Sequence, residues 1–251
     1  MTTSVTEHRP RTSVLTRPVA MRLAAVEYQR FIDALALLSP QDWSQPTECP
    51  GWDVKAMAAH ALGMAEMAAS IREQLRQVKT ATKRGGVFLD ALTSLQVEER
   101  QEMTPAQIVD RFQRVAPKAS RGRRLTPGLI RRRTMPQLQI VGDHEESWTI
   151  GYLVDVILTR DPWMHRIDIS RATGALPILT PEHDGVLVAD VVLEWAQRHG
   201  QPCVLALAGP AGGSWTFGSG GENLELDAVQ FCRTLSGRAP AEGLLRTQVP
   251  F

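Results

Sequence analysis

The fold of this chain is decided by two segments in which polar side chains interrupt an apolar helical pattern: Trp52-Asp-Val-Lys-Ala-Met-Ala-Ala-His-Ala-Leu-Gly-Met-Ala-Glu-Met67 and Gly151-Tyr-Leu-Val-Asp-Val-Ile-Leu-Thr-Arg-Asp-Pro-Trp-Met-His-Arg-Ile-Asp168. In the first, methionines recur at helical spacing and His60 lies on the same face. In the second, Asp161 and His165 share one face, four residues apart. An inward carboxylate and two inward imidazoles are costly unless they are paired or bind a cation, so the pattern indicates a metal site inside a helical bundle.

Each of these residues also has an ordinary structural interpretation. A buried histidine such as His60 is usually just hydrogen-bonded within the core. Asp161 and His165 alone are compatible with an ion pair on a helix surface, or with Asp161 as the N-cap before Pro162. His144 is a rival ligand with acidic neighbours, but acids before a helix also suit its N-terminus. Spacing alone leaves these interpretations open beside the metal site.

The composition is that of an ordinary globular protein. The chain has 251 residues, 43% hydrophobic and 22% charged, with a formal net charge of +1. This charge gives no overall attraction to nucleic acid or to a membrane. The three cysteines are widely separated, which argues against a disulfide framework and a CxxC metal motif, so we expect a reducing cytoplasm. Residues 1–18 contain no apolar run and are expected to form a loose tail.

Apolar spacing, together with proline and glycine positions, predicts four long helices. They cover about residues 21–38, 53–78, 104–116 and 147–172. A kink is expected at Pro162 in the last of them. The basic stretch 118–133 is expected to be a solvated crossover loop rather than a binding site. Residues 19–175 would thus form a four-helix bundle, an architecture in which metal sites are common.

After Gly174 the sequence changes character. It predicts a helix, three short strands separated by glycine-rich turns, and a closing helix. These cover about residues 181–199, 203–208, 215–217, 224–226 and 227–236. The predicted fold class is therefore an N-terminal helical bundle followed by a small α+β domain at residues 176–251.

Short motifs towards both ends of the chain carry a further signal. The N-terminal ones are Trp43 with Pro-Thr-x-Cys-Pro-Gly-Trp-Asp-Val at 46–54, His60-x-x-Gly63, and Thr-Arg-Asp-Pro-Trp-Met-His-Arg-Ile-Asp at 159–168. The C-terminal ones are Gly-Pro-x-Gly-Gly-x-Trp-Thr at 209–216, Asp-Ala-x-x-Phe-Cys-Arg-x-Leu-Ser-Gly-Arg at 227–238, and Val-Pro-Phe at 249–251. Together these motifs resemble the mycothiol-dependent maleylpyruvate isomerase family, which belongs to the DinB-like metal-binding bundles.

The resemblance implies a divalent metal, usually zinc, held by His60, Asp161 and His165. The best-known pattern of the family has Glu where this chain has Asp161. The shorter carboxylate could instead lie outside the direct ligands, with water in its position. Asp168 would orient a metal-bound imidazole through its other nitrogen, although an ion pair with an arginine of the same helix is an equal alternative.

The resemblance also implies a reaction. A low-molecular-weight thiol, mycothiol, would lose its proton at the metal and attack a small, electrophilic substrate by addition, isomerisation or substitution. Negative charge would then develop on the substrate, where a guanidinium is useful. The candidates are Arg238 and, in reserve, Arg233, each of which is equally compatible with a surface position. Trp52 and Trp163 are candidates for the pocket wall, or for the core.

An alternative class of function is a non-catalytic, metal-binding or regulatory protein that retains the bundle. A nucleic-acid partner is not expected, because no recognisable binding motif accompanies the basic stretch. A membrane partner is not expected either, and the sequence does not indicate an oligomeric state.

Overall fold

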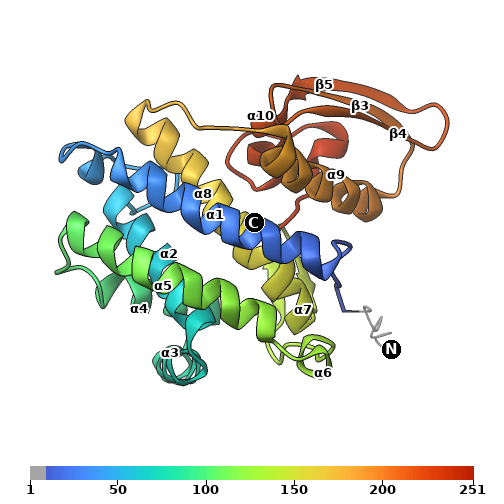
Figure 1. The fold of residues 1–251 in the computed structure, drawn as a ribbon. Helices are drawn as coiled ribbons and strands as arrows, with labels where there is room; N and C mark the ends of the chain where they lie inside the picture. Colours follow the sequence, from blue (N-terminus) through green and yellow to red (C-terminus); the bar gives the residue numbers. More distant parts are fainter. Residues whose placement is uncertain (1–9) are drawn as a thin grey trace.

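Four long helices pack side by side at the centre of the molecule (Figure 1). The computed structural model describes residues 10–251. The bundle helices are α1 (Arg17–Ala36), α2 (Val54–Ala69), α5 (Pro105–Leu125) and α8 (Leu158–Thr173). Their inward faces share an apolar core that includes Phe31, Leu62 and Phe112. The predicted bundle is therefore confirmed.

The second predicted helix is in fact two helices. α2 ends at Ala69, and α3 (Ile71–Arg84) begins after Ser70, whose backbone is extended with φ −147° and ψ 119°. The Ser70 side chain accepts a hydrogen bond from the Glu73 amide and so caps α3. α3 and α4 (Phe88–Glu98) both pack against α2 on one side of the bundle. The prediction of one continuous helix through residue 78 was wrong.

The third predicted helix is longer than its pattern indicated. α5 continues to Leu125, through part of the stretch expected to be a solvated loop. The reason is Arg123, which is 1% exposed and points into the bundle. Its guanidinium donates hydrogen bonds to the carbonyl oxygens of Val154 and Leu158, both at 2.9 Å. The prediction of a solvated loop was therefore wrong for residues 118–125, which belong to α5.

These two bonds also explain how the fourth helix continues through a proline. The helix starts as α7 (Ile150–Tyr152), passes through a π-helical turn at Leu153–Ile157 and continues as α8. Pro162 has no N–H to offer the Leu158 carbonyl one turn earlier. Arg123 supplies the missing donor. α8 therefore extends to Thr173 and carries both Asp161 and His165.

The C-terminal region is a small α+β layer beside the bundle (Figure 1). Strand β3 (Cys203–Ala208) is antiparallel to β4 (Gly213–Phe217) and parallel to β5 (Glu222–Asp227), in the sheet order β4-β3-β5. Helices α9 (Val186–His199) and α10 (Ala228–Leu235) share a core with the buried side chains of β3. This core also includes Trp163 of α8, so packing crosses the predicted boundary near residue 175, which stays a prediction.

Several shorter elements complete the chain. They are a 3-10 turn at Asp42–Ser44, helix α6 (Gly128–Arg131), strands β1 (Gln139–Val141) and β2 (His144–Glu146), a π-helical turn at Pro181–Gly185 and a 3-10 turn at Gly243–Arg246. β1 and β2 pair as an antiparallel hairpin. His144 therefore lies in a strand and not at the start of the fourth helix.

The first part of the predicted tail, residues 1–9, lies outside the described residues. Within residues 10–18, Arg11 is bonded to the segment that precedes the fourth helix. The Arg11 amide donates to the Ser147 carbonyl at 2.8 Å, and the Thr149 amide donates to the Arg11 carbonyl at 3.0 Å. α1 then begins at Arg17. Arg11 is thus held by backbone hydrogen bonds, and Arg17 and Pro18 belong to α1.

Within residues 10–251, none of the helices combines the length and apolarity that a membrane span requires. All three cysteines lie in this described part of the chain and are free thiols; Cys203 and Cys232 are buried and Cys49 is half-buried.

Candidate metal centre

The side chains of His60, Asp161 and His165 converge between α2 and α8. His60 Nε2 lies 3.5 Å and His165 Nε2 lies 3.3 Å from the same oxygen, Oδ1 of Asp161. The three ligand-type atoms all lie within 4.8 Å of one another. Both histidines are buried, at 4% and 6% exposed. The two helices thus aim three potential metal ligands at one point.

Local structure explains this convergence. Asp53 caps α2 by accepting a hydrogen bond from the Ala56 amide at 2.7 Å, which sets where the helix begins. His60 then lies two turns into α2. Its neighbours Ala59 and Ala61 are buried, as is Met57 one turn earlier. On α8, the spacing of four residues places Asp161 and His165 on one face, one turn apart.

The charges of the three groups are strongly coupled. Burial alone would raise the pKa of Asp161, but His165 and His60 outweigh it and hold that pKa well below its usual range. Burial alone would lower the pKa of His165, but Asp161 raises it well above its usual range. Asp161 is therefore a carboxylate whose described partners are two imidazole nitrogens. A divalent cation at this point would take the place of the imidazole protons.

Asp168 links His165 to the C-terminal region. Its Oδ2 lies 3.2 Å from His165 Nδ1, and the Arg238 guanidinium donates to both carboxylate oxygens at 2.8 and 2.9 Å. Burial would raise the pKa of Asp168, but His165 and Arg238 lower it. The arginines of its own helix bond other carboxylates. The structure thus brings together the predicted imidazole contact and an ion pair with an arginine far away in the sequence.

Two of the remaining predicted residues, Trp52 and Arg233, lie near the site. The Trp52 ring lies beside the site, 5.1 Å from the His60 ring centroid and 6.1 Å from that of His165. Arg233 does not bond Asp168 and donates instead to Glu48, at 2.6 Å.

Trp163 lies in the core, which is the second of the two positions that the sequence left open for it. Its indole donates to Asp184 at 2.9 Å, and the ring stacks on Phe251 within the C-terminal core. Positions two apart on a helix differ by about 200° in direction. A residue halfway between Asp161 and His165 therefore faces away from them.

Cys49 is a site residue that the sequence reasoning missed. Its Sγ lies 3.9 Å from Oδ2 of Asp168 and 3.7 Å from a guanidinium nitrogen of Arg238. Cys49, His165 and Asp168 form a second group of potential metal ligands. The available signal was the position of this cysteine three residues before Trp52, within the motif at 46–54.

A cavity of about 490 Å³ has Trp52 in its lining. Its lining includes Ala56, Lys55 and Arg100 but none of the three candidate ligands. Trp52 therefore belongs both to the lining of this cavity and to the surroundings of the two imidazoles.

Comparisons with known proteins agree with this architecture. A family model described as the mycothiol maleylpyruvate isomerase N-terminal domain matches residues 24–170. A crystal structure of the mycothiol-dependent maleylpyruvate isomerase aligns with 91% of this chain and 93% of its own, with a TM-score of 0.57 and 14% identity. A histidine-to-alanine mutant of that enzyme aligns over the same shares at 14% identity, with a TM-score of 0.53. No curated protein matches the chain. At this identity, the structural likeness shows the fold alone.

Proposed function

This chain belongs to the mycothiol maleylpyruvate isomerase family, as its motifs indicated, and from this premise we propose that it is a metal-dependent enzyme that activates mycothiol for attack on a small electrophile. The observation that carries the proposal is the convergence of His60, Asp161 and His165 on one point. The three unpaired cysteines support a reducing cytoplasm as its location.

The donor set fits zinc. Two imidazoles and one carboxylate are a common set of three protein ligands for catalytic zinc, which keeps a further position for water or substrate. His60 Nε2, His165 Nε2 and Asp161 would hold the ion. When bound, zinc would supply a positive charge that stabilises the thiolate form of a coordinating thiol near neutral pH.

The residues around this set have separate tasks. Asp168 accepts from Nδ1 of His165 and so holds its Nε2 toward the ligand position. Arg238 fixes Asp168 and brings positive charge next to the site, where an acidic substrate and its developing negative charge would be stabilised. Trp52 covers one side of both imidazoles and limits their access to water.

The function is tested by mixing zinc-loaded protein with mycothiol and maleylpyruvate, and with other small electrophiles in parallel. We expect consumption of at least one electrophile that needs both the thiol and the metal. The controls omit mycothiol or use protein stripped of metal by a chelator. Zinc binding without consumption of any electrophile would favour the non-catalytic, regulatory alternative.

Replacing Arg238 by alanine is expected to lower kcat/KM by about 10–100-fold, the usual cost of losing an outer-shell partner at a metal site. The reason is the loss of the guanidinium that bonds both oxygens of Asp168. Arg171→Ala is the matched control, because Arg171 also bonds Glu48 and makes no hydrogen bond to Asp168 or Arg238 among the described residues. Steady-state kinetics and zinc content would be measured for both variants. Equal losses in the two would contradict the role given to Arg238.

A further inference from the structure

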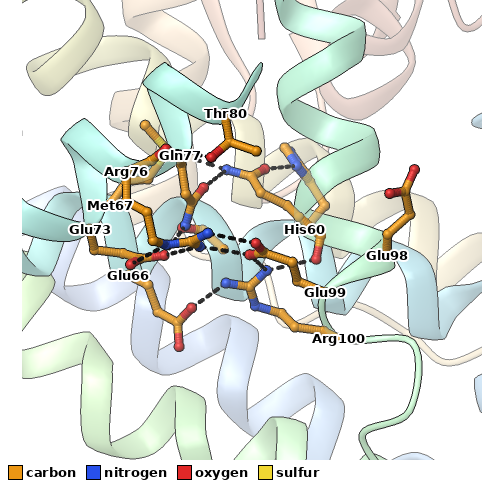
Figure 2. Close-up of polar contacts among 12 residues, drawn as sticks. His60, Glu66, Met67, Glu73, Arg76, Gln77, Thr80, Glu98, Glu99 and Arg100 are labelled. Atoms are coloured by element: carbon orange, nitrogen blue, oxygen red, sulfur yellow. Dashed lines mark hydrogen bonds and ion pairs between the residues drawn. The ribbon is translucent and has the colours of Figure 1, made fainter. Parts of the chain in front are cut away.

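The second ring nitrogen of His60 faces a line of amide side chains from α3 and α4 (Figure 2). His60 Nδ1 lies 2.7 Å from Oε1 of Gln96, and Gln96 Nε2 donates to Oε1 of Gln77 at 2.9 Å. Gln77 Nε2 donates to Glu73 at 2.8 Å, and Arg76 donates to the same carboxylate. Both glutamines are 0% exposed. An uninterrupted line of hydrogen bonds thus joins the candidate ligand to an ion pair at the surface.

The outer end of this line fixes the orientation of Gln77. The hydrogen bond from Arg76 lowers the pKa of Glu73 to about 2, so its carboxylate stays ionised and can only accept. The Gly63 carbonyl, 3.3 Å from Gln77 Nε2, can also only accept. The amide nitrogen of Gln77 must therefore face these two oxygens. Its own oxygen is left facing Gln96.

The same reasoning applies to Gln96. Its amide nitrogen faces the Gln77 oxygen and also lies 3.1 and 3.3 Å from the sulfur atoms of Met64 and Met67, which are weak acceptors. Reversing the amide would place an oxygen against three acceptors. The oxygen of Gln96 is therefore the atom that meets His60.

We propose that Gln96 is a positioning residue that keeps a proton on Nδ1 of His60 and so leaves the Nε2 lone pair free for the metal. The hydrogen bond made by one ring nitrogen decides which form of a neutral imidazole is present, and only the unprotonated nitrogen can bind a metal. The Glu73–Arg76 ion pair fixes the orientation of the Gln77 amide, and Gln77 fixes that of Gln96. The orientation of Gln96 then decides which nitrogen of His60 carries the proton. This inference rests on the proposed metal site and adds a residue to it.

The surface of α2 is shaped for this contact. A Cβ atom added at Gly63 would lie 2.6 Å from Cγ and 2.8 Å from Cβ of Gln96. Glycine inside a helix costs stability relative to alanine, so this position carries an unfavourable residue that close packing explains. Gly63 follows His60 by three residues on the same helix. The motif His60-x-x-Gly63 thus contains both the ligand and the space for the residue that orients it.

The first test measures zinc affinity by competition with a chelator. Gln96→Leu is expected to bind zinc about 10–100-fold more weakly than the wild-type chain. Leu95→Ala is the control for a general loss of packing. Leu95 is a buried neighbour on α4, and its side chain has no polar atom that could bond the amides or His60. Unchanged affinity in Gln96→Leu would overturn the proposal, as would an equal loss in Leu95→Ala.

The second test needs neither metal nor activity. Imidazole nitrogen NMR shifts of metal-free, isotope-labelled Asp161→Ala protein at alkaline pH show which nitrogen of His60 carries the proton, because this variant lacks the carboxylate that otherwise faces Nε2. With Gln96 intact the proton should lie on Nδ1, and adding Gln96→Leu should remove this preference. A proton on Nε2 in Asp161→Ala with Gln96 intact would overturn the proposal. Failure of the proposed thiol chemistry would leave this result untouched, so the two failures are distinguishable.

Gly63→Ala provides a variant that removes no polar group. It should weaken zinc binding in the same direction as Gln96→Leu, because the new methyl group displaces the Gln96 side chain. The double variant Gly63→Ala/Gln96→Ala should lose little more zinc affinity than Gln96→Ala alone, since both changes break the same contact. Full additivity of the two losses would contradict a shared route through Gln96.

Discussion

The His165→Ala protein is expected to lose its zinc and its thiol-dependent activity together. His165 supplies one of three ligand-type groups and is the only described residue that belongs to both potential metal groups of the site. Its removal leaves one imidazole and a short carboxylate, too few groups for the usual three-ligand catalytic set. After dialysis, zinc content should fall from about one ion per chain to near zero, and turnover should fall to background. His60→Ala should give the same result.

The matched control is His144→Ala. His144 has acidic neighbours, which made it the rival ligand in the sequence, but its side chain is 83% exposed in the hairpin and, among residues 10–251, pairs only with Asp143. This variant should keep its zinc and its activity. If His60→Ala and His165→Ala both keep a full complement of zinc, the assignment of the site is wrong. The inward histidines would then be hydrogen-bonded core residues, and the regulatory interpretation would lead.

The sequence identified the residues of the candidate site only where helical spacing carried the information. His60, Asp161 and His165 were selected because each interrupts an apolar face, and residues on one face of a helix stay together in the fold. Arg238 and Cys49 meet Asp168 from sequence distances of 70 and 119 residues, which no local period encodes. The contact between Gln96 and His60 depends on how α4 packs on α2, and it was missed.

Helix boundaries show the same limit. The break at Ser70 carried a local signal, because a serine three residues before Glu73 is typical of a helix N-cap, yet the apolar pattern on both sides outweighed it. The end of α5 carried no local signal in the sequence. Arg123 looks like any arginine of a basic loop until Pro162, on another helix, leaves a carbonyl without a donor. Tertiary packing thus decided which basic residue was buried.

Replacing Arg160 by methionine is expected to destabilise the fold by about 3–5 kcal/mol near neutral pH, the usual cost of removing one partner from a buried ion pair. Arg160 is 1% exposed and joins α8 to α9, where it donates to Asp190 at 2.6 Å and to Glu194 at 2.8 Å. Methionine fills similar space but leaves both carboxylates without this cation. Urea unfolding would measure the loss, and the melting temperature should fall by roughly 6–20 °C.

The pH dependence separates lost charge from lost packing. Burial already raises the pKa of Asp190 despite Arg160, whereas in Glu194 burial is outweighed by Arg160 and Arg198, which lower its pKa. Without Arg160, the folded-state pKa of both groups should rise above the unfolded value. A group shifted in this direction favours folding below its unfolded pKa and loses that contribution as pH rises through the folded-state pKa. The deficit of Arg160→Met should therefore be largest near neutral pH and shrink toward about pH 4.

Arg114→Met is the control for this prediction. Arg114 pairs with Asp110 on the surface of α5, with side chains 65% and 57% exposed, and such pairs contribute about 0–1 kcal/mol. A small, pH-independent loss in both variants would show that the buried pair contributes little beyond volume. A large loss that shrinks in acid would instead make Arg160 the electrostatic link that holds the C-terminal layer against α8. It would also explain how Arg238 is kept within reach of Asp168, because that contact requires the layer to stay in place.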